Sequence, residues 1–298
     1  MADEKIFATG LKFPEGPAFD KDGTLYLVEL AGGRVTKITP DGEVSVLADM
    51  GGSPNGLAFG PDRNLYVCNS GARWAPETCT DGKPGPGDKP GLMQRVYLDG
   101  RYETLISEID GVPLNSPNDV CFDSHGGFYF TDPIWPESVD DLSALEPGSL
   151  CYSTIDGDAK RMHTGVMFPN GLGVTEDGST LIVLESGTGK LLAFPILEPG
   201  VLGEQRDFAY MGEGQVPDGM CFDSEGRILA ASHGGNTIFV FPPTGGNPEH
   251  KIDAGDVSVT NVCFGGPNFS TLYITQSDKG QVSTQEWKTS GMVLFPDR

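Results

Sequence analysis

Six stretches of the sequence share one pattern, and each begins at a polar residue whose side chain could bind a cation or move a proton. A small residue stands three places after the polar residue, and an apolar residue follows it directly. The six polar residues are Glu15, Asn55, Asn118, Asn170, Asp218 and Thr260. They are separated by 40, 63, 52, 48 and 42 residues. Self-similarity on this scale, with short strands in every copy, is typical of a β-propeller.

In a closed ring of such repeats, the six polar side chains would converge on the central axis. Two carboxylates and several carboxamide oxygens directed at one point would repel each other or lack donors unless a cation lay between them. Oxygen donors without His or Cys favour hard ions. We therefore expect one divalent cation, calcium first, with magnesium, manganese or zinc as alternatives. The competing interpretation is that these residues only cap strands and bond to neighbouring backbone.

A second equivalent position lies at the end of the apolar strand in each copy. Its occupants are Glu29, Asn69, Asp132, Glu185, Ser232 and Gln276. Such residues could orient metal ligands or meet substrate hydroxyls, and we expect Asp132 and Glu185 to do so. For Glu29 and Gln276, a solvated loop edge is an equal alternative. His233 follows Ser232 and is expected near the same face, as a substrate contact, an acid or base, or a structural hydrogen bonder.

Three long insertions are expected on the face that carries the polar ring, because antiparallel strands alternate in direction. They span residues 71–90, 133–148 and 277–290, and they contain all three tryptophans, Trp74, Trp135 and Trp287. Loops on a rigid scaffold commonly carry function. We expect Trp74 and Trp135 to shield a substrate pocket, although a single Trp in a loop equally often only packs that loop.

Cysteine occupies the small position of three copies, at Cys121, Cys221 and Cys263. Ala or Gly occupies it in the others, so these thiols are interpreted as small buried groups near a crowded axis rather than as metal ligands. The sequence contains no Gly-Xaa-Ser-Xaa-Gly elbow, phosphate-binding loop or dinucleotide fingerprint.

The elements that must position these residues read as four-stranded antiparallel blades. Each copy supplies two strands, and more polar strands around Asp-Gly turns follow, as at Asp41-Gly42 and Asp99-Gly100. The sixth copy runs short, because after Leu272–Ile274 only Gly291–Phe295 reads as a strand. The spare segment Lys5–Leu11 fits the gap and would cover an exposed edge. The sequence therefore predicts an all-β, six-bladed β-propeller, one domain over residues 1–298, closed by the N-terminal strand.

Composition limits the partners of the protein. The chain has 298 residues and a formal net charge of −22, which argues against nucleic acid and anionic membrane as partners. No run of about 18 apolar residues predicts a membrane span. The N-terminus lacks signal-peptide features, so a cytoplasmic location with six reduced cysteines is expected. The oligomeric state is left open.

Several motifs resemble those of the gluconolactonase/regucalcin family. They are Phe13-Pro14-Glu15-Gly16-Pro17, Ser116-Pro117-Asn118-Asp119, Phe130-Thr131-Asp132-Pro133, Pro169-Asn170-Gly171-Leu172 and Pro217-Asp218-Gly219-Met220-Cys221. The resemblance covers nearly the whole chain and implies a six-bladed propeller with one divalent cation on its axis. It implies Glu15, Asn170 and Asp218 as main ligands and Asn118 as a further ligand or substrate contact.

The resemblance is less informative about the substrate. Asn55 has no firm counterpart in the family and is placed among the expected substrate contacts. The family's substrate-binding Arg is not evident, and Arg73 is a candidate only by position.

The leading hypothesis for function is hydrolysis of a lactone, with a sugar lactone or a related small lactone as substrate. The cation would polarise the ester carbonyl, and Asp218 would take a proton from the attacking water. Direct attack by Asp218 is the less favoured route. Hydrolysis of a phosphoester or organophosphate at the same metal is a second hypothesis. A third, from another class, is a non-catalytic metal-binding propeller that binds a protein partner.

Overall fold

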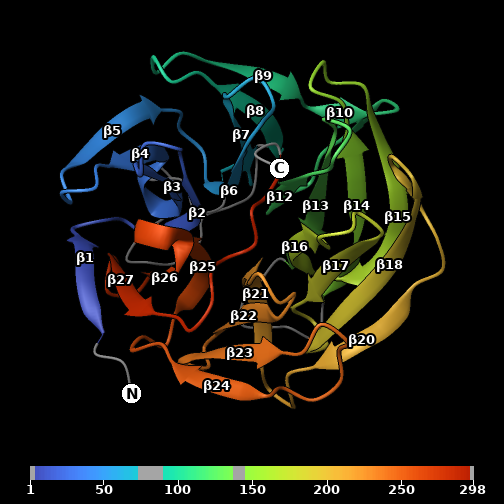
Figure 1. Ribbon diagram of the computed structural model, residues 1–298. Coiled ribbons are helices and arrows are strands. Elements are labelled where there is room, and N and C mark those ends of the chain that lie inside the picture. The colour runs from blue at the N-terminus through green and yellow to red at the C-terminus, as the bar shows by residue number, and fades with distance from the viewer. Residues whose placement is uncertain (1–3, 73–89, 137–144, 296–298) are drawn as a thin grey trace.

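The computed structural model describes residues 4–72, 90–136 and 145–295. Six antiparallel sheets surround a central axis as the blades of a propeller, which confirms the predicted fold class (Figure 1). In this part of the chain, two short 3-10 helices, Leu30–Gly32 and Pro267–Phe269, interrupt the strands. Among the described residues, no helix is long and apolar enough to cross a lipid bilayer.

The first three blades follow the chain from the axis outward. Blade 1 consists of β2 (Pro14–Phe19), β3 (Leu25–Glu29), β4 (Arg34–Ile38) and β5 (Val44–Asp49). Blade 2 consists of β6 (Pro54–Phe59), β7 (Leu65–Asn69), β8 (Leu92–Val96) and β9 (Tyr102–Ile106). After a small hairpin of β10 (Glu108–Ile109) and β11 (Val112–Pro113), blade 3 consists of β12 (Val120–Phe122), β13 (Phe128–Ile134), β14 (Glu146–Ser153) and β15 (Ala159–Met167).

The second half of the ring repeats this order. Blade 4 consists of β16 (Pro169–Val174), β17 (Thr180–Glu185), β18 (Lys190–Glu198) and β20 (Arg206–Tyr210), with β19 (Val201–Leu202) also paired to β18. Blade 5 consists of β21 (Val216–Phe222), β22 (Ile228–His233), β23 (Thr237–Phe241) and β24 (His250–Asp253). Blade 6 consists of β25 (Val259–Gly265), β26 (Thr271–Gln276), β27 (Gln281–Glu286) and the N-terminal strand β1 (Lys5–Thr9).

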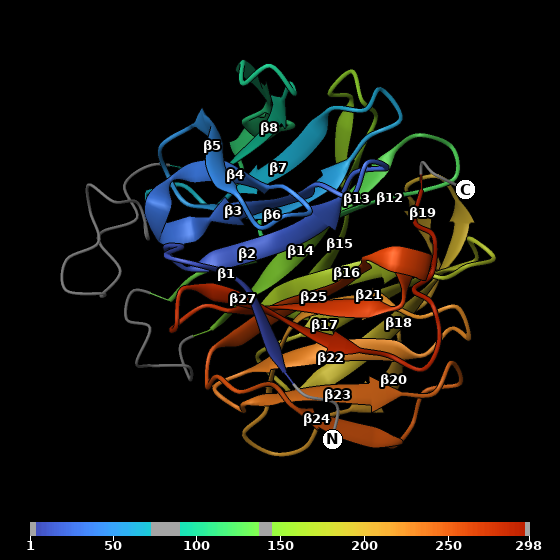
Figure 2. The ribbon, with the colours of Figure 1, turned by 60° about the vertical axis from the view of Figure 1, so that its left-hand side comes forward.

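The N-terminal strand closes the ring as predicted. Strand β1 pairs antiparallel with β27 and forms the outer edge of blade 6 (Figures 1 and 2). The third strand of that blade was placed wrongly from the sequence. It is β27 rather than Gly291–Phe295, and the connection from β26 is short, so residues 277–290 are not a long insertion.

Apolar side chains form the core between neighbouring blades. The second strands, such as β3 and β7, are buried along their whole length because sheets cover both faces. Tyr66 of blade 2, for example, packs against Phe122 and Phe128 of blade 3, with ring centroids 5.0 and 5.3 Å apart. Burial of each such side chain contributes about 1.5–3 kcal/mol, which holds the blades in fixed positions around the axis.

A break in strand register marks the polar position in five blades. The pairing of the innermost strand shifts between Glu15 and Ala18, and again at the matching places in blades 2, 4, 5 and 6. Such bulges re-aim side chains, here at the end of the strand nearest the polar ring. Blade 3 differs from expectation, because Asn118 precedes β12; its N–H instead bonds the Thr131 carbonyl (2.9 Å).

Candidate metal and catalytic site

The polar residues of the six copies lie at one mouth of the axial channel, which is named here the polar mouth. Hydroxyl groups from one blade bond the backbone of the next beside these residues. Ser70 donates to the Pro117 carbonyl (2.8 Å) and Ser277 to the Pro14 carbonyl (2.8 Å). Thr131 donates to the carbonyl of Asn170 itself (2.9 Å). The blades are therefore locked together where the polar side chains emerge.

Glu15 is one of two carboxyls in the ring, and it is buried with 3% of its surface exposed. Its Oε2 accepts a hydrogen bond from Asn261 Nδ2 (2.9 Å) and another from the Gly16 N–H. Burial raises the pKa of Glu15 to about 7, although these bonds favour the charged form.

Asp218 faces Glu15 across the mouth. Burial, followed by the nearby charge of Glu15, raises the pKa of Asp218 well above its usual range, while a hydrogen bond with Asn170 opposes the shift. Within the described residues, neither carboxyl forms an ion pair with Lys or Arg. The basic group beside Asp218 is His233, whose Nδ1 lies 4.0 Å from Asp218 Oδ2. Burial lowers the pKa of His233, against the opposing charges of Asp278 and Asp256, so the neutral imidazole is favoured.

The amides of the ring differ in their partners. Asn170 Nδ2 donates to Ser186 Oγ (3.2 Å), and the same amide group supplies the hydrogen bond that opposes the pKa shift of Asp218. In the described part of the chain, the side chains of Asn55 and Asn118 have no protein hydrogen-bond partner, although both residues are buried. Thr260 differs, because its hydroxyl bonds Thr275 Oγ1 (2.9 Å) and Ser277 Oγ (2.8 Å). Thr260 therefore links blade 6 to the carboxyl of Glu15, with which it also forms a hydrogen bond, whereas the amides of Asn55 and Asn118 are available.

Side chains at the second equivalent position accept hydrogen bonds from the backbone segments that lead into the polar ring. Glu29 accepts from the Lys12 N–H (2.7 Å), Asn69 from Ser53 (2.9 Å), and Glu185 from Met167 (2.8 Å). Asp132 Oδ1 accepts from the N–H groups of Asn115 (2.9 Å) and Ser116 (2.8 Å). The carboxylates of Asp132 and Glu185 are thus engaged by protein donors. The solvated-edge interpretation of Glu29 and Gln276 is wrong, because both are fully buried.

The three tryptophans do not share one environment. Trp135 is half-buried and packs edge-on against Phe168, with ring centroids 4.6 Å apart, just before Asn170. Trp74 and Arg73 lie outside the described residues. Trp287 does not lie on the face of the polar ring, as the sequence predicted. Its Nε1 donates to Asp223 (3.0 Å) in the β21–β22 turn, at the opposite end of the channel.

Sequence reasoning missed the layer directly below the polar mouth. The residue after each ring position is Gly in four blades, but it is Asp119 in blade 3 and Asn261 in blade 6. A Cβ on Gly56 would lie 2.5 Å from Asp119 Oδ1, and one on Gly219 would lie 2.1 Å from Asn261 Cγ. These two side chains therefore fill the space that the glycines leave. The alternation of Gly with two polar exceptions was the signal in the sequence.

The polar mouth suits a cation, although its carboxylates alone supply too few ligands for a metal site. Among the residues described, no three His, Cys, Asp or Glu side chains lie together in a metal-binding arrangement. The two carboxyls nevertheless raise each other's cost of ionisation and have no Lys or Arg partner. An ion would offset that cost, with the carboxamide oxygens of Asn118 and Asn170 completing an all-oxygen donor set.

Fold and site together define a propeller with an acidic, oxygen-rich site on its axis. Residues 13–278 match the family model of the SMP-30/gluconolactonase/LRE-like region, and the chain belongs to this family.

Individual relatives agree with this assignment. The chain is 29% identical to diisopropyl-fluorophosphatase of Loligo vulgaris (93% of this chain, 90% of the relative). It is 25% identical to a gluconolactonase of Zymomonas mobilis (92% and 78%). The solved structure of a gluconolactonase from Xanthomonas campestris is 27% identical and superposes with a TM-score of 0.77 (96% and 89%).

Proposed function

We propose that the protein is a divalent-metal-dependent lactonase. The observation that carries the proposal is the pair Glu15 and Asp218, two buried carboxyls that face each other without a Lys or Arg partner. A stable protein gains nothing from such a pair unless a cation binds there. The gluconolactonases among the relatives supply the substrate class.

The proposed ligands are Glu15, Asn118, Asn170 and Asp218, and calcium is the ion that suits their oxygen atoms best. The bound ion would supply Lewis-acid polarisation of the ester carbonyl. Asp218 would accept a proton from the attacking water. His233 stays neutral at 4.0 Å from Asp218 and can take a hydrogen bond from the substrate or the water.

Substrate contacts are proposed for the groups at the mouth that the protein leaves available. Asn55 and Asn118 have side-chain amides free of protein partners among the described residues, and Trp135 provides an apolar wall. Asp132 and Glu185 act one step away, because they hold the backbone at Asn115, Ser116 and Met167. Trp74 remains a proposed shield.

The test is acid release from a panel of aldonolactones and of aliphatic and aromatic lactones. It is run after chelation and again with calcium, magnesium, manganese or zinc restored. We expect release only with metal, and fastest with calcium. No release with any ion, from a protein shown to bind one, would overturn the lactonase proposal.

A second candidate is hydrolysis of a fluorophosphate or phosphoester at the same site. It is favoured by the similarity to diisopropyl-fluorophosphatase, which extends over 93% of the chain. The same proposed ion would then bind a phosphoryl oxygen. Turnover of diisopropyl fluorophosphate, measured beside the lactone panel on one preparation, separates the two candidates by their kcat/KM values.

A further inference from the structure

A cavity of about 600 Å³ occupies the other end of the axial channel. Asp119 and Asn261 line its inner end, and the β2–β3 turn around Asp20 lies at its outer end, far along the strand from Glu15. The polar mouth and this cavity are thus separated by the layer that Asp119 and Asn261 fill. The polar mouth and its proposed reaction do not use the cavity.

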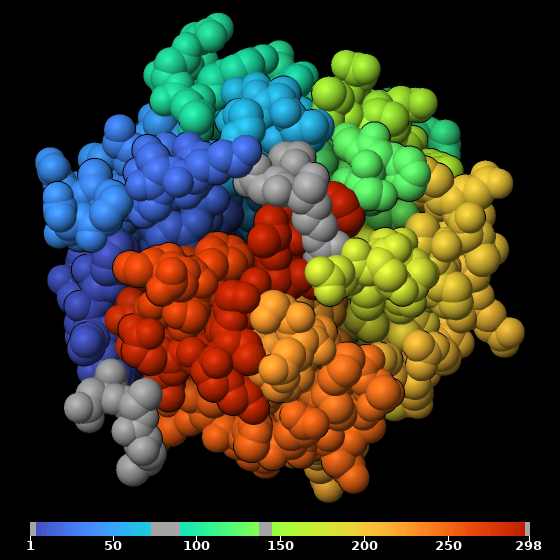
Figure 3. Space-filling view, viewed as in Figure 1, coloured from blue at the N-terminus to red at the C-terminus, as the bar shows by residue number. Residues whose placement is uncertain are grey.

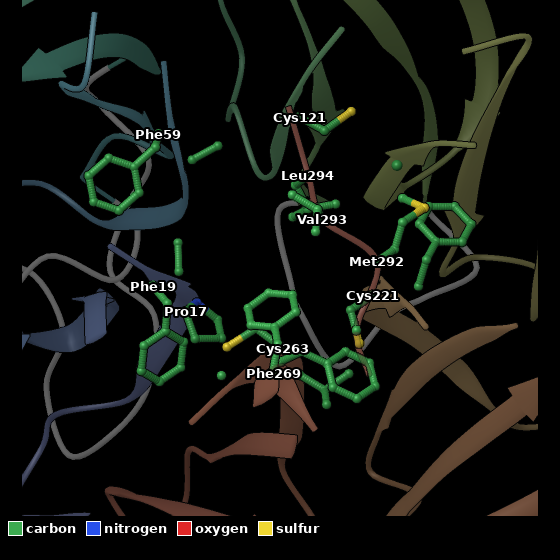
Figure 4. A pocket seen from close by; sticks show the side chains of 18 of the residues that line it. Pro17, Phe19, Phe59, Cys121, Cys221, Cys263, Phe269, Met292, Val293 and Leu294 are labelled. Atoms are coloured by element: carbon green, nitrogen blue, oxygen red, sulfur yellow. The ribbon is translucent and has the colours of Figure 1, made fainter. Parts of the chain in front are cut away.

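The walls of the cavity are apolar and aromatic. Cys121, Cys221 and Cys263 project into it from three blades, beside Phe19, Phe59 and Phe269 (Figure 4). Protein interiors leave few voids larger than a water molecule, so a hollow of this size is not a packing defect. Small-molecule pockets typically measure about 300–1,000 Å³ and are lined mainly by such side chains.

The segment Gly291–Phe295 lies across the outer opening of this cavity, opposite the polar mouth. Gly291 N–H bonds the Phe269 carbonyl (2.7 Å), and Met292 N–H bonds the Phe222 carbonyl (3.0 Å). Beyond Met292, Val293 and Leu294 are 49% and 55% exposed, and Phe295 packs on the opposite side of the channel against the blade 2–3 core. Figure 3 shows this red segment crossing the central hollow. It covers the cavity as a strap anchored at its two ends.

One carboxyl group lies at the inner end of the cavity. The carboxyl of Asp119 accepts bonds from the backbone N–H groups of Val120 (2.9 Å) and Leu172, and it forms no ion pair within the described residues. The other charged lining residues, Asp20 and Lys21, lie at the outer rim, where Arg63 pairs with Asp20. A ligand that fills the space between the aromatic walls would thus place its far end against a carboxyl that no Lys or Arg of the described residues pairs with.

From this geometry we propose a second binding site for a compact apolar molecule that carries an amine. The apolar body fills the space between the Phe and Cys side chains, the ammonium group pairs with Asp119, and the strap Gly291–Phe295 covers the bound molecule. Aromatic faces also attract cations, which adds to the preference for an amine over an alcohol or an acid.

The experiment is calorimetric titration of the calcium-loaded protein with 4-phenylbutylamine, with 4-phenylbutan-1-ol as the neutral control of the same shape. We expect one saturable site for the amine and binding at least about tenfold weaker for the alcohol. Equal binding of the two probes, or no saturable binding of the amine, would overturn the proposal.

Two variants locate the site. Cys263→Phe fills the cavity and is expected to abolish amine binding while lactone turnover is retained. Ala58→Leu fills the same space from blade 2, and it is used instead if Cys263→Phe does not fold. Phe295→Ala loosens the strap and should raise the association rate of the amine. Unchanged amine affinity in a folded cavity-filling variant would place the binding at the acidic mouth and refute the second site.

Discussion

The two ends of the axial channel are built from the same strands and differ in chemistry. At the polar mouth, the first residue of the repeat supplies Glu15 and Asp218, which lack a Lys or Arg partner among the described residues. Three residues further along the same strands, Ala18 and Cys221 line an apolar cavity. Side-chain alternation and the bulge between these positions allow one strand to serve both ends. The repeat thus encodes a polar and an apolar site, separated by a single layer.

If the reaction takes place at the polar mouth, the largest loss of activity should follow a substitution there. Asp218→Asn should lower lactone kcat by at least about 10²–10³-fold, because a general base contributes on that scale. The fold should persist, since Asn has the same shape. Steady-state kinetics with thermal melting measures both. Asp207→Asn, at a surface ion pair, is the matched control. Near-normal turnover by the Asp218 variant would contradict the role.

The acidic end should also dominate how stability depends on pH and metal. Folding raises the pKa of Glu15 from 4.5 to about 7, so between these values the folded state binds a proton that the unfolded chain has released. Stability of the chelated protein must therefore fall as pH rises through this window, by on the order of 3 kcal/mol from Glu15.

Calcium should reverse that loss, so it should raise Tm more at pH 8 than at pH 5, measured by scanning calorimetry. Glu15→Gln is the control, because it removes one of the titrating carboxyls and should weaken the pH dependence. Asp119 and Asp218, whose pKa values burial also raises, retain the remainder. An identical calcium shift at both pH values in the native sequence would show that the carboxyls do not bind the ion.

The fold was largely predictable because each copy repeats the same local signals. Polar residue, small residue, turn and apolar strand recur six times, and the short sixth copy indicated closure by Lys5–Leu11. The prediction was wrong for the third strand of blade 6, because the pattern does not show which segment pairs with the second strand. Gly291–Phe295 looks like a strand, but Gln281–Glu286 pairs with β26, which frees the last segment to cross the channel.

The site was predictable only where the type and repeat position of a residue indicate its role without knowledge of its hydrogen-bond partners. Glu15 and Asp218 are acids at an equivalent position, so their convergence followed from symmetry. The functions of Asp132 and Glu185 did not follow, because only the structure shows that backbone N–H groups occupy their oxygens. Asp119 was missed, since its significance depends on Gly56 of the neighbouring blade, which leaves the space that the Asp119 side chain fills.

The separating layer predicts a smaller, purely steric effect. Gly56→Ala places a Cβ 2.5 Å from Asp119 Oδ1 and 2.6 Å from the Asn118 carbonyl oxygen. Overpacking of this kind should cost about 1–3 kcal/mol of unfolding free energy, measured by denaturant titration. Gly203→Ala, where the nearest atom is Pro195 Cβ at 3.2 Å, should cost less. Equal costs would mean that the layer is not tightly filled.

The apolar end should tolerate truncation almost without effect. Cys263→Ala removes one sulfur from a wall that already borders open space, and Ala stands at the equivalent positions Ala18 and Ala58. We expect a loss below about 1 kcal/mol and unchanged lactone kinetics, measured by melting and turnover. A neutral result would show that the two ends act independently. A fall in turnover would instead mean that the layer of Asp119 and Asn261 transmits changes to Glu15, since Asn261 bonds that carboxylate directly.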